Sequence, residues 1–382
     1  MRVRHQTCAM MLLSAITILG FVACSPGDPV TRVYYVAADE VEWDYAPAGL
    51  DVVTGQPFDS VAREFTEPGP RLMGRKVMKA LYREYTDSTF STLRPRPPEW
   101  EHLGFLGPLI RAEVGDTIRV VFRNNARFPV SVHPHGVFYD KDSEGAPYED
   151  GTEAAMKADD GVPTGGTHVY VWPVPERAGP TAHETSTVFW MYHSHTREVE
   201  DVNAGLLGPM IVGRRGALRP DGMPKDVDRE VIIGFIEVDE GASLYTDHNI
   251  RTYWRTPEKA VRTMLFGVPS LGPDGPAHFR ETLNGFLYGN GPMPSMRVGE
   301  RVRWYIMGST NFEIHAPHWH GNVVSIDEMR TDVAALLPMG MAVADMTPDN
   351  PGIWLFHCHV GAHLMMGMQG RYEVLPATET PN

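Results

Sequence analysis

Residues 108–136, PLIRAEVGDTIRVVFRNNARFPVSVHPHG, are similar in pattern to residues 293–321, MPSMRVGERVRWYIMGSTNFEIHAPHWHG. Each stretch has a Val-Gly-Asp or Val-Gly-Glu turn, a strand of alternating character, a polar turn, and a second strand that ends in His-x-His-Gly. Residues 189–212 likewise resemble residues 353–375, and the two similar pairs occur in the same order along the chain. A repeat of this kind indicates two related domains.

The composition of both halves predicts β-structure. Short runs rich in Val, Ile, Tyr, Trp and Phe are broken by Gly, Pro, Asn and Asp, and long helical periodicity is almost absent. This pattern is typical of all-β proteins and predicts two Greek-key β-sandwich domains. We place the first domain at residues 30–213, a polar linker at residues 214–228 and the second domain at residues 229–378.

The first 24 residues have the pattern of an export signal. Two arginines precede an apolar run at residues 9–23, and the run ends directly before Cys24. The segment resembles a bacterial lipoprotein signal in which Cys24 becomes the lipidated first residue. Ordinary signal cleavage nearby is the alternative, because Phe21 stands where Leu is usual. Either way we expect an exported protein, periplasmic or on the outer membrane or cell surface, that contacts the membrane only through a lipid on Cys24.

Charge and cysteine content narrow the functional classes. The chain has 34 basic and 48 acidic residues and a net charge of −14, a balance that disfavours binding to nucleic acid. Beyond the signal segment Cys358 is the sole cysteine, so this part of the chain has no intramolecular disulfide.

Histidine is concentrated in four short clusters, which hold 10 of the 16 histidines. On a β-strand a spacing of two places both imidazoles on the same face. One such pair is as often structural as metal-binding, but four pairs at equivalent places in two repeats predict a metal cluster. The clusters are His133 and His135; His193 and His195; His315, His318 and His320; and His357, His359 and His363.

The donor types indicate which metal is bound. Imidazole suits zinc, copper, iron or nickel, whereas one thiolate with two imidazoles and a distant thioether suits a blue-copper electron-transfer site. A structural zinc site is the alternative, but this set is a poor one for tetrahedral zinc. The neighbours of the cysteine on its strand point to the opposite face, where they can join a second metal site. The predicted blue-copper ligands are His315, Cys358, His363 and Met368.

These motifs resemble those of multicopper oxidases, and the wider sequence resembles the ceruloplasmin branch of that family. With two domains where ceruloplasmin has six, the chain is more similar to the two-domain, small-laccase type. The resemblance implies two cupredoxin-like domains. It is carried by VEWDYAPAG (41–49), GRKVMKALYREYTD (74–87), HLGFLGPLIRAEVGDTIRV (102–120), VWPVPERAGP (171–180) and NGFLYGN (284–290).

The resemblance implies about four coppers per chain, one type 1, one type 2 and two type 3. It assigns His315, Cys358, His363 and Met368 to the type 1 copper. It assigns His133 and His318 to the type 2 copper, and His135, His193, His195, His320, His357 and His359 to the type 3 pair. In the first domain the type 1 positions hold Val130, Ser194, Val199 and Ala204, which excludes a second blue copper and argues against the nitrite reductase type.

The resemblance also implies an assembly and a reaction. Each domain supplies half of the trinuclear ligands, so by analogy with ceruloplasmin three copies close a ring with clusters between subunits. A cluster within one chain is the alternative. Single electrons from a reductant would pass from the type 1 copper through Cys358 and reduce dioxygen to water. Glu144 and Asp142 are candidate proton relays, or solvated loop carboxylates.

The sequence favours phenols or aryl amines as reductants, as in laccases. The acid of the ceruloplasmin iron site is here Ala362, and the iron-site histidine aligns near Glu281, although Asp327 or Glu328 could replace them. A non-catalytic blue-copper carrier is disfavoured because it would need none of the trinuclear histidines. Cu(I) is a further candidate because methionines, otherwise explained by core packing, surround the motif: Met329, Met339, Met341, Met346, Met365 and Met366.

Overall fold

The computed structural model describes residues 28–257, 262–265, 268–271, 278–309 and 313–377. The predicted signal segment, with Cys24, lies outside these residues.

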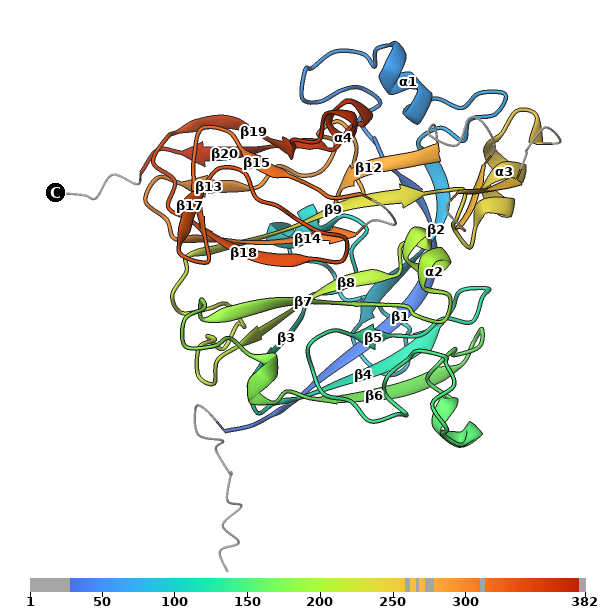
Figure 1. Ribbon diagram of the computed structural model, residues 1–382, viewed down its shortest axis with the longest axis vertical. Helices are drawn as coiled ribbons and strands as arrows, with labels where there is room; N and C mark the ends of the chain where they lie inside the picture. The colour runs from blue at the N-terminus through green and yellow to red at the C-terminus, as the bar shows by residue number, and fades with distance from the viewer. Residues whose placement is uncertain (1–27, 258–261, 266–267, 272–277, 310–312, 378–382) are drawn as a thin grey trace, which may run out of the picture.

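The first domain is a sandwich of two four-stranded sheets (Figure 1). The edge-to-edge orders are β2-β1-β4-β6 and β3-β8-β7-β5, and β1 pairs antiparallel with β2 and parallel with β4. The strands are β1 (Thr31–Asp44), β2 (Lys76–Tyr85), β3 (Ile110–Glu113), β4 (Thr117–Asn124), β5 (His133–Pro134), β6 (Thr167–Pro173), β7 (Thr187–His193) and β8 (Leu207–Gly213).

The second domain repeats this plan with a larger first sheet. Its orders are β12-β9-β14-β18-β16-β17 and β13-β20-β19-β15, and a separate hairpin pairs β10 with β11. The strands are β9 (Arg229–Asp239), β10 (Arg262–Leu265), β11 (Val268–Leu271), β12 (Phe279–Leu283), β13 (Ser295–Arg297), β14 (Val302–Ser309), β15 (Pro317–Trp319), β16 (Val324–Ile326), β17 (Met329–Thr331), β18 (Met341–Met346), β19 (Gly352–Cys358) and β20 (Gln369–Leu375).

Helices are few and short, so the predicted all-β fold of two sandwiches is confirmed. Two of them, α2 and α4, follow the equivalent strands β7 and β19. No helix among the described residues is long and apolar enough to cross a membrane. The α-helices are α1 (Ser60–Thr66), α2 (Glu198–Ala204), α3 (Thr246–Tyr253) and α4 (Gly361–Met366), and the 3-10 helices are η1 (Pro98–Leu103), η2 (Ala154–Lys157) and η3 (Glu176–Ala178).

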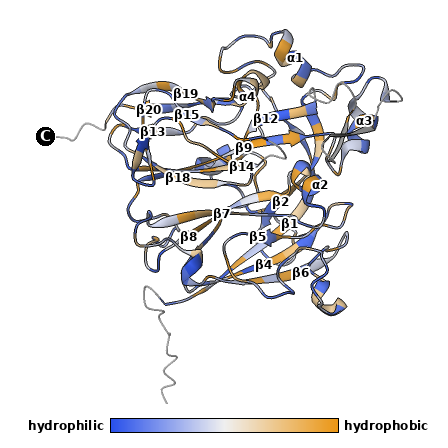
Figure 2. Cartoon of the chain, viewed as in Figure 1, coloured by the Kyte–Doolittle hydropathy of each residue, from blue (hydrophilic) through white to orange (hydrophobic). Residues whose placement is uncertain are grey.

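Three apolar cores hold the chain together. One lies inside each sandwich, and the third joins Phe105 and Phe189 of the first domain to Ile232 and Tyr305 of the second. Hydrophobic residues accordingly run along strands of both sandwiches (Figure 2). The predicted linker is also fastened, because Leu218 N donates to Glu113 Oε1 at 2.7 Å. A shared core of this kind fixes the two domains relative to each other.

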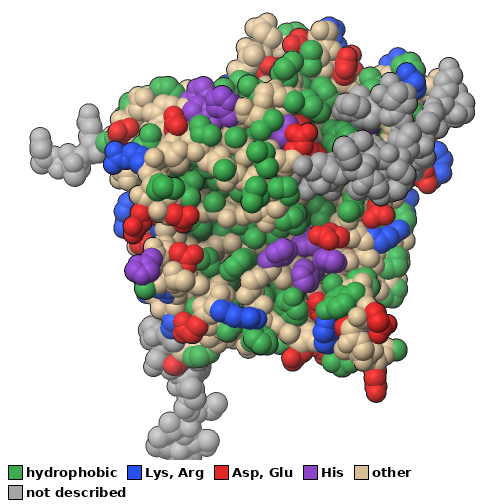
Figure 3. Space-filling view, viewed as in Figure 1, with side chains coloured by type: hydrophobic (Ala, Val, Ile, Leu, Met, Phe, Trp, Pro, Cys, Tyr) green, Lys and Arg blue, Asp and Glu red, His purple; other side chains and the backbone are tan. Residues whose placement is uncertain are grey.

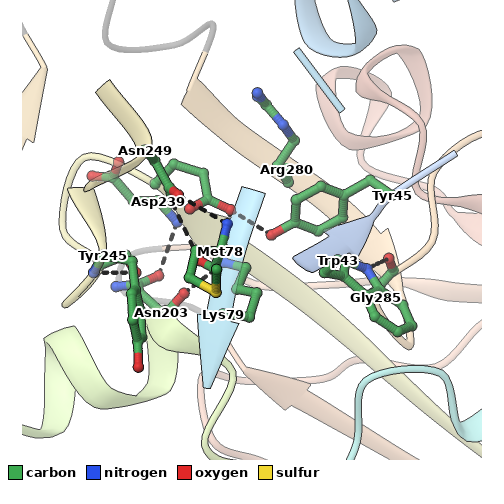
Figure 4. Close-up of polar contacts among 12 residues, drawn as sticks. Trp43, Tyr45, Met78, Lys79, Asn203, Asp239, Tyr245, Asn249, Arg280 and Gly285 are labelled. Atoms are coloured by element: carbon green, nitrogen blue, oxygen red, sulfur yellow. Dashed lines mark hydrogen bonds and ion pairs between the residues drawn. The ribbon is translucent and has the colours of Figure 1, made fainter. Parts of the chain in front are cut away.

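A buried ionic cluster sits in the same junction (Figure 4). Lys79 Nζ on β2 lies 2.6 Å from Glu240 Oε1, directly after β9, and both side chains are fully buried. Tyr45 OH donates to the same oxygen at 2.6 Å, and Lys79 Nζ donates to Asn203 O at 2.8 Å. Two charges taken from water are tolerated only when they are paired and hydrogen-bonded in this way.

Candidate metal centre

The sole cysteine among the residues that the structure describes lies beside two of its predicted partners. Cys358 Sγ is 3.5 Å from His363 Nδ1 and 4.0 Å from His315 Nδ1, and all three side chains are buried. Donor atoms bound to one metal at about 2.0–2.3 Å lie about 3–4 Å apart. Met368 is fully buried in the same core cluster as Cys358. The donor set and its spacing therefore fit a type 1 copper.

Local structure brings the side chains of His315, Cys358 and His363 together and places Met368 beside Cys358. His315 exchanges two backbone hydrogen bonds with Leu336, and His363 lies on α4. The helix ends at Gly367, whose φ of +112° is a left-handed conformation that favours glycine. The chain therefore reverses, and Cys358 N donates to Met368 O at 3.1 Å.

Burial favours the neutral forms of His315 and Cys358. Burial, together with a smaller effect of the nearby His363, lowers the pKa of His315 to about 3. Burial also raises the pKa of the Cys358 thiol, while the Ala316 N–H, 3.3 Å from the sulfur, opposes this. Neutral imidazole is the form that binds metal, whereas the thiol must lose its proton to do so.

The eight remaining histidines form two half-sites, one in each domain. In the first, His135 Nε2 lies 3.0 Å from His193 Nε2. In the second, His320 Nε2 lies 3.0 Å from His357 Nε2. Two nitrogens that are each about 2.0 Å from one metal are separated by about 3 Å. Each half-site thus holds a pair of imidazoles at the spacing of ligands to a single ion.

Backbone carbonyls fix which ring nitrogen is free. A carbonyl oxygen only accepts, so each of four Nδ1 atoms donates its proton and leaves Nε2 for a metal. The donors and acceptors are His133 to Glu144 O at 2.6 Å, His193 to Ser194 O at 3.0 Å, His318 to Asp332 O at 2.9 Å, and His357 to Cys358 O at 2.7 Å.

Close packing against a tryptophan ring explains why each His-x-His-Gly motif ends in glycine. A Cβ on Gly136 would lie 2.3 Å from the Trp190 ring, and a Cβ on Gly321 would lie 2.4 Å from the Trp354 ring. Both glycines also have positive φ, +78° and +72°. Each motif therefore lies against a tryptophan of the paired strand, β7 or β19, three residues before the first histidine of the next pair.

Within the described residues of one chain, the two half-sites are separate. In the described part of the molecule, ring contacts join His133 to His135, His193 and His195, and join His318 to His320, His357 and His359, but none joins the two sets. Figure 3 shows histidines in separate places on one face, over the β5 and β7 region and over the β15 and β19 region.

The first domain replaces the type 1 set with a hydrogen-bonded pair. Ser194 Oγ accepts from Ser131 N at 3.0 Å, just as Cys358 Sγ accepts from Ala316 N, and donates to Asp201 Oδ2 at 2.6 Å. Burial raises the pKa of Asp201 to about 6. This side-chain pair offers no thiolate and no imidazole.

The two predicted proton relays lie near the first half-site but their carboxylates are engaged elsewhere. Glu144 Oε2 is 2.6 Å from Lys141 Nζ, and Glu144 contacts His133 through its backbone carbonyl. Asp142 Oδ1 accepts from Ser143 Oγ at 3.4 Å, and its carbonyl accepts from His168 Nε2. The structure therefore gives Glu144 a positioning contact, and the relay stays a prediction.

Sequence reasoning missed a group of three carboxylates around His363. Glu313 Oε2 lies 2.9 Å from His363 Nε2, and Glu281 Oε2 lies 3.8 Å from His363 Nδ1. Glu237 pairs with Glu281 in register across β9 and β12, and carboxylate atoms of both lie within 4.8 Å of the imidazole. Burial raises the pKa of Glu281 well above its usual value, and the charge of Glu237 adds to this.

The pairing register of β9 and β12 places Glu237 beside Glu281, and a single sequence does not show this register. The acids proposed from sequence as substitutes, Asp327 and Glu328, are instead exposed in the turn between β16 and β17. Ala362 is exposed on α4, next to His363.

Comparison with known proteins identifies the family. Two domain models, each described as multicopper oxidase, match residues 103–216 and 269–378. The chain belongs to the multicopper oxidase family, and copper is the metal that this family binds.

Relatives in sequence include proteins named ferroxidase, hephaestin and ceruloplasmin. Ferroxidase HEPHL1 of Mus musculus is 44% identical over 368 residues, which are 95% of this chain and 30% of that protein. Hephaestin of Homo sapiens is 39% identical over 93% of this chain and 30% of its own length, and human ceruloplasmin is 36% identical over 91% and 31%. The chain spans about a third of the length of these curated relatives.

Solved structures share the fold. The multicopper oxidase mgLAC has a TM-score of 0.56 at 20% identity, covering 91% of this chain and 88% of its own. The blue copper oxidase from Nitrosomonas europaea has a TM-score of 0.55 at 18% identity, covering 91% and 86%. These neighbours support two cupredoxin-like domains.

Proposed function

We propose that the protein is a metallo-oxidase that oxidises Fe(II) and passes the electrons to dioxygen. The observation that carries this proposal is the group of three carboxylates, Glu237, Glu281 and Glu313, around the predicted type 1 ligand His363. The relatives named ferroxidase support it. The laccase-like oxidation of phenols or aryl amines, favoured by the sequence alone, has less support, because acids from two strands and one connecting segment lie near His363 although Ala362 replaces the iron-site acid.

Copper binding in this proposal follows the predicted ligand sets. His315, Cys358, His363 and Met368 hold one type 1 ion, and the eight remaining histidines of the two half-sites hold one type 2 and two type 3 ions. When bound, these coppers supply one-electron transfer and the four-electron reduction of dioxygen to water. A carrier with one copper would have no use for eight further histidines, two pairs of which place their Nε2 atoms 3.0 Å apart.

The chain's own residues bind the reductant and conduct the electron. Carboxylates stabilise a trivalent ion more than a divalent one, so Glu281 and Glu313 favour the loss of an electron from bound Fe(II). The His363 ring contacts both the carboxylates and Cys358 Sγ. From the sulfur, one peptide unit and the 2.7 Å bond from His357 Nδ1 to Cys358 O lead to the half-site histidines.

We propose further that a second copy completes the trinuclear site. The half-site of one subunit would face the other half-site of its neighbour, and repetition of this head-to-tail contact closes a homotrimer. The separation of the two sets of histidines within one chain supports this arrangement over a cluster inside one chain. The proposed location, exported and lipid-anchored through Cys24, rests on the signal segment alone.

Oxygen uptake tests the proposal. The copper-loaded protein is expected to consume oxygen with Fe(II), and more slowly with 2,6-dimethoxyphenol. Cys358→Ser is expected to lower uptake with both donors at least about 100-fold and to remove about one copper per chain, because the thiolate ligand is lost. Full copper loading without uptake from any donor would exclude an oxidase.

A further inference from the structure

A cavity of about 760 Å³ lies between strand β2 and the segment of residues 93–97. Strand β2 is the last strand of its sheet, and Arg94 N donates to Glu84 O at 2.8 Å, so this segment follows the outer edge of β2. The volume is in the range of binding sites for small organic molecules. Apolar side chains form much of the wall: Val41, Trp43, Leu81, Trp100 and Leu109.

Four arginines line this cavity, and two of them are closely paired with acids. Arg94 Nε lies 2.8 Å from Glu84 Oε1. Arg111 Nη2 lies 2.6 Å from Glu230 Oε2 at the start of β9, so this pair also joins the two domains. The positive charges of these two arginines are therefore balanced by the protein itself.

Arg83 and Arg96, the other two, are not balanced in this way. Arg96 Nη1 donates to Gly104 O at 2.8 Å and Arg96 Nη2 donates to Leu106 O at 2.6 Å, and both acceptors are uncharged carbonyls. Among the residues that the structure describes, no carboxylate forms an ion pair with Arg96. Arg83 Nη1 lies 3.8 Å from Asp39 Oδ2, which is too long for a hydrogen bond.

The two guanidinium groups also act on each other. Burial lowers the pKa of Arg96, Tyr192 opposes this, and the positive charge of Arg83 acts in the same direction as burial. Glu101 and Asp221, the remaining acids of the described wall, are exposed and are not among the charges that shift this pKa. An anion placed between two like charges relieves their repulsion.

Prolines fix the segment that carries Arg96. In RPRPP, residues 94–98, a proline follows each arginine. Pro97 has φ −60° and ψ 148°, the polyproline II conformation. Because a proline ring fixes φ, the segment loses little conformational freedom when a ligand binds. The facing wall is fixed as well, since Trp43 Nε1 donates to Gly285 O of the second domain at 2.7 Å (Figure 4).

We propose that this cavity binds a small organic carboxylate with an apolar body, and that the carboxylate lies between Arg83 and Arg96. The planar guanidinium group presents parallel N–H donors that match the two oxygens of a carboxylate. The apolar body would contact the Trp100 side of the wall. In the described part of the chain the lining includes neither the predicted copper ligands nor the carboxylate group at His363, so binding does not depend on the proposed function.

Calorimetric titration of the copper-loaded protein tests the proposal. The probe is 2-naphthoate, with an expected dissociation constant on the order of 0.1–1 mM at low salt. Its neutral isostere 2-naphthamide should bind at least about tenfold more weakly, because it lacks the charge. Raising NaCl from about 20 mM to about 300 mM should weaken binding of the carboxylate but not of the amide.

Two variants locate the site. Arg83→Gln should weaken 2-naphthoate binding about 3- to 10-fold, because one of the two guanidinium groups is lost, and should leave 2-naphthamide unaffected. Leu93→Trp should abolish binding of both compounds by filling the cavity. Arg119→Gln is the matched control, since Arg119 is an exposed arginine of β4 that does not line the cavity. It removes the same charge and should leave both affinities unchanged.

Three results would overturn the proposal. The first is the absence of 2-naphthoate binding to the wild type. The second is equal 2-naphthoate affinity in the wild type, Arg83→Gln and Leu93→Trp, which would place the ligand elsewhere, including on copper. The third is an equal affinity for inorganic sulfate at the same ionic strength, which would mean that the arginines select charge alone and not an organic carboxylate.

Discussion

At the scale of single residues, Cys358 connects the two kinds of predicted copper site. Its sulfur faces His315 and His363, while its carbonyl accepts from His357 Nδ1 at 2.7 Å. This arrangement follows from the alternation of a β-strand, which sends neighbours to opposite faces. Alternation depends only on neighbouring residues of one strand. The copper ligands could therefore be predicted from the sequence. The carboxylates around His363 come from three separated segments, and only the fold brings them together.

One buried histidine outside the metal sites makes stability depend on pH. His102 Nε2 accepts from Ile232 N at 3.2 Å, which requires a neutral ring, and burial lowers the pKa of His102 to about 4. Below the unfolded pKa of about 6.5 the unfolded chain takes up a proton that the folded chain does not, so stability is lost as the pH falls from 6.5 toward 4.

Urea unfolding at pH 7.5 and pH 5.0 checks this effect. Between pH 7.5 and pH 5.0 the metal-free wild type should lose about 2 kcal/mol of its free energy of unfolding because of His102. His102→Gln should not lose this amount. The variant should be less stable at pH 7.5 but show a flatter dependence on pH. An unchanged pH dependence in His102→Gln would contradict a neutral His102 in the folded state.

At the scale of elements, the join between β2 and β9 decides how the sandwiches sit together. Lys79 on β2 and Glu240 after β9 form a fully buried pair 2.6 Å apart. The strands themselves were predictable from composition and turns. Their partners across the junction were not, because the core of Phe105, Phe189, Ile232 and Tyr305 depends on contacts between residues more than 40 positions apart.

Removing one member of this ion pair should destabilise the junction strongly. Lys79→Met removes the ammonium group 2.6 Å from the buried Glu240 and leaves Arg280 as the other cation that acts on it, which is expected to cost about 3 kcal/mol in the free energy of unfolding. Chemical denaturation measures the loss. The double variant Lys79→Met/Glu240→Gln should recover part of the lost free energy of unfolding, because the carboxylate charge of Glu240 is also removed. Two single variants whose effects simply add in the double variant would show that the pair is not coupled.

At the scale of the whole molecule, one chain holds two incomplete halves of a histidine cluster. The internal repeat predicted this division, because equivalent motifs occur in both domains. It could not predict the distance between the halves, which depends on how the two sandwiches pack. Since no ring contact joins the two half-sites in the described part of one chain, we expect the proposed oxidase to be complete only as an assembly.

Complementation between two inactive variants tests the assembly. His193→Ala breaks the half-site of the first domain, and His320→Ala breaks that of the second. Refolded or co-expressed together, they should form mixed trimers in which about one quarter of the clusters are intact, since each intact half is drawn with a probability of about one half. Oxygen uptake should return to about that fraction of wild type. A cluster within one chain would give no recovery.

The most direct test of the central claim is Fe(II) oxidation by Glu281→Gln/Glu313→Gln, measured as kcat/KM beside the wild type. Glu328→Gln, which removes an exposed turn carboxylate, is the matched control. We predict that the double variant loses at least about tenfold in kcat/KM for Fe(II), while its blue absorption is still reduced normally by ferrocenemethanol. Unchanged Fe(II) oxidation in the double variant would contradict a carboxylate site at His363.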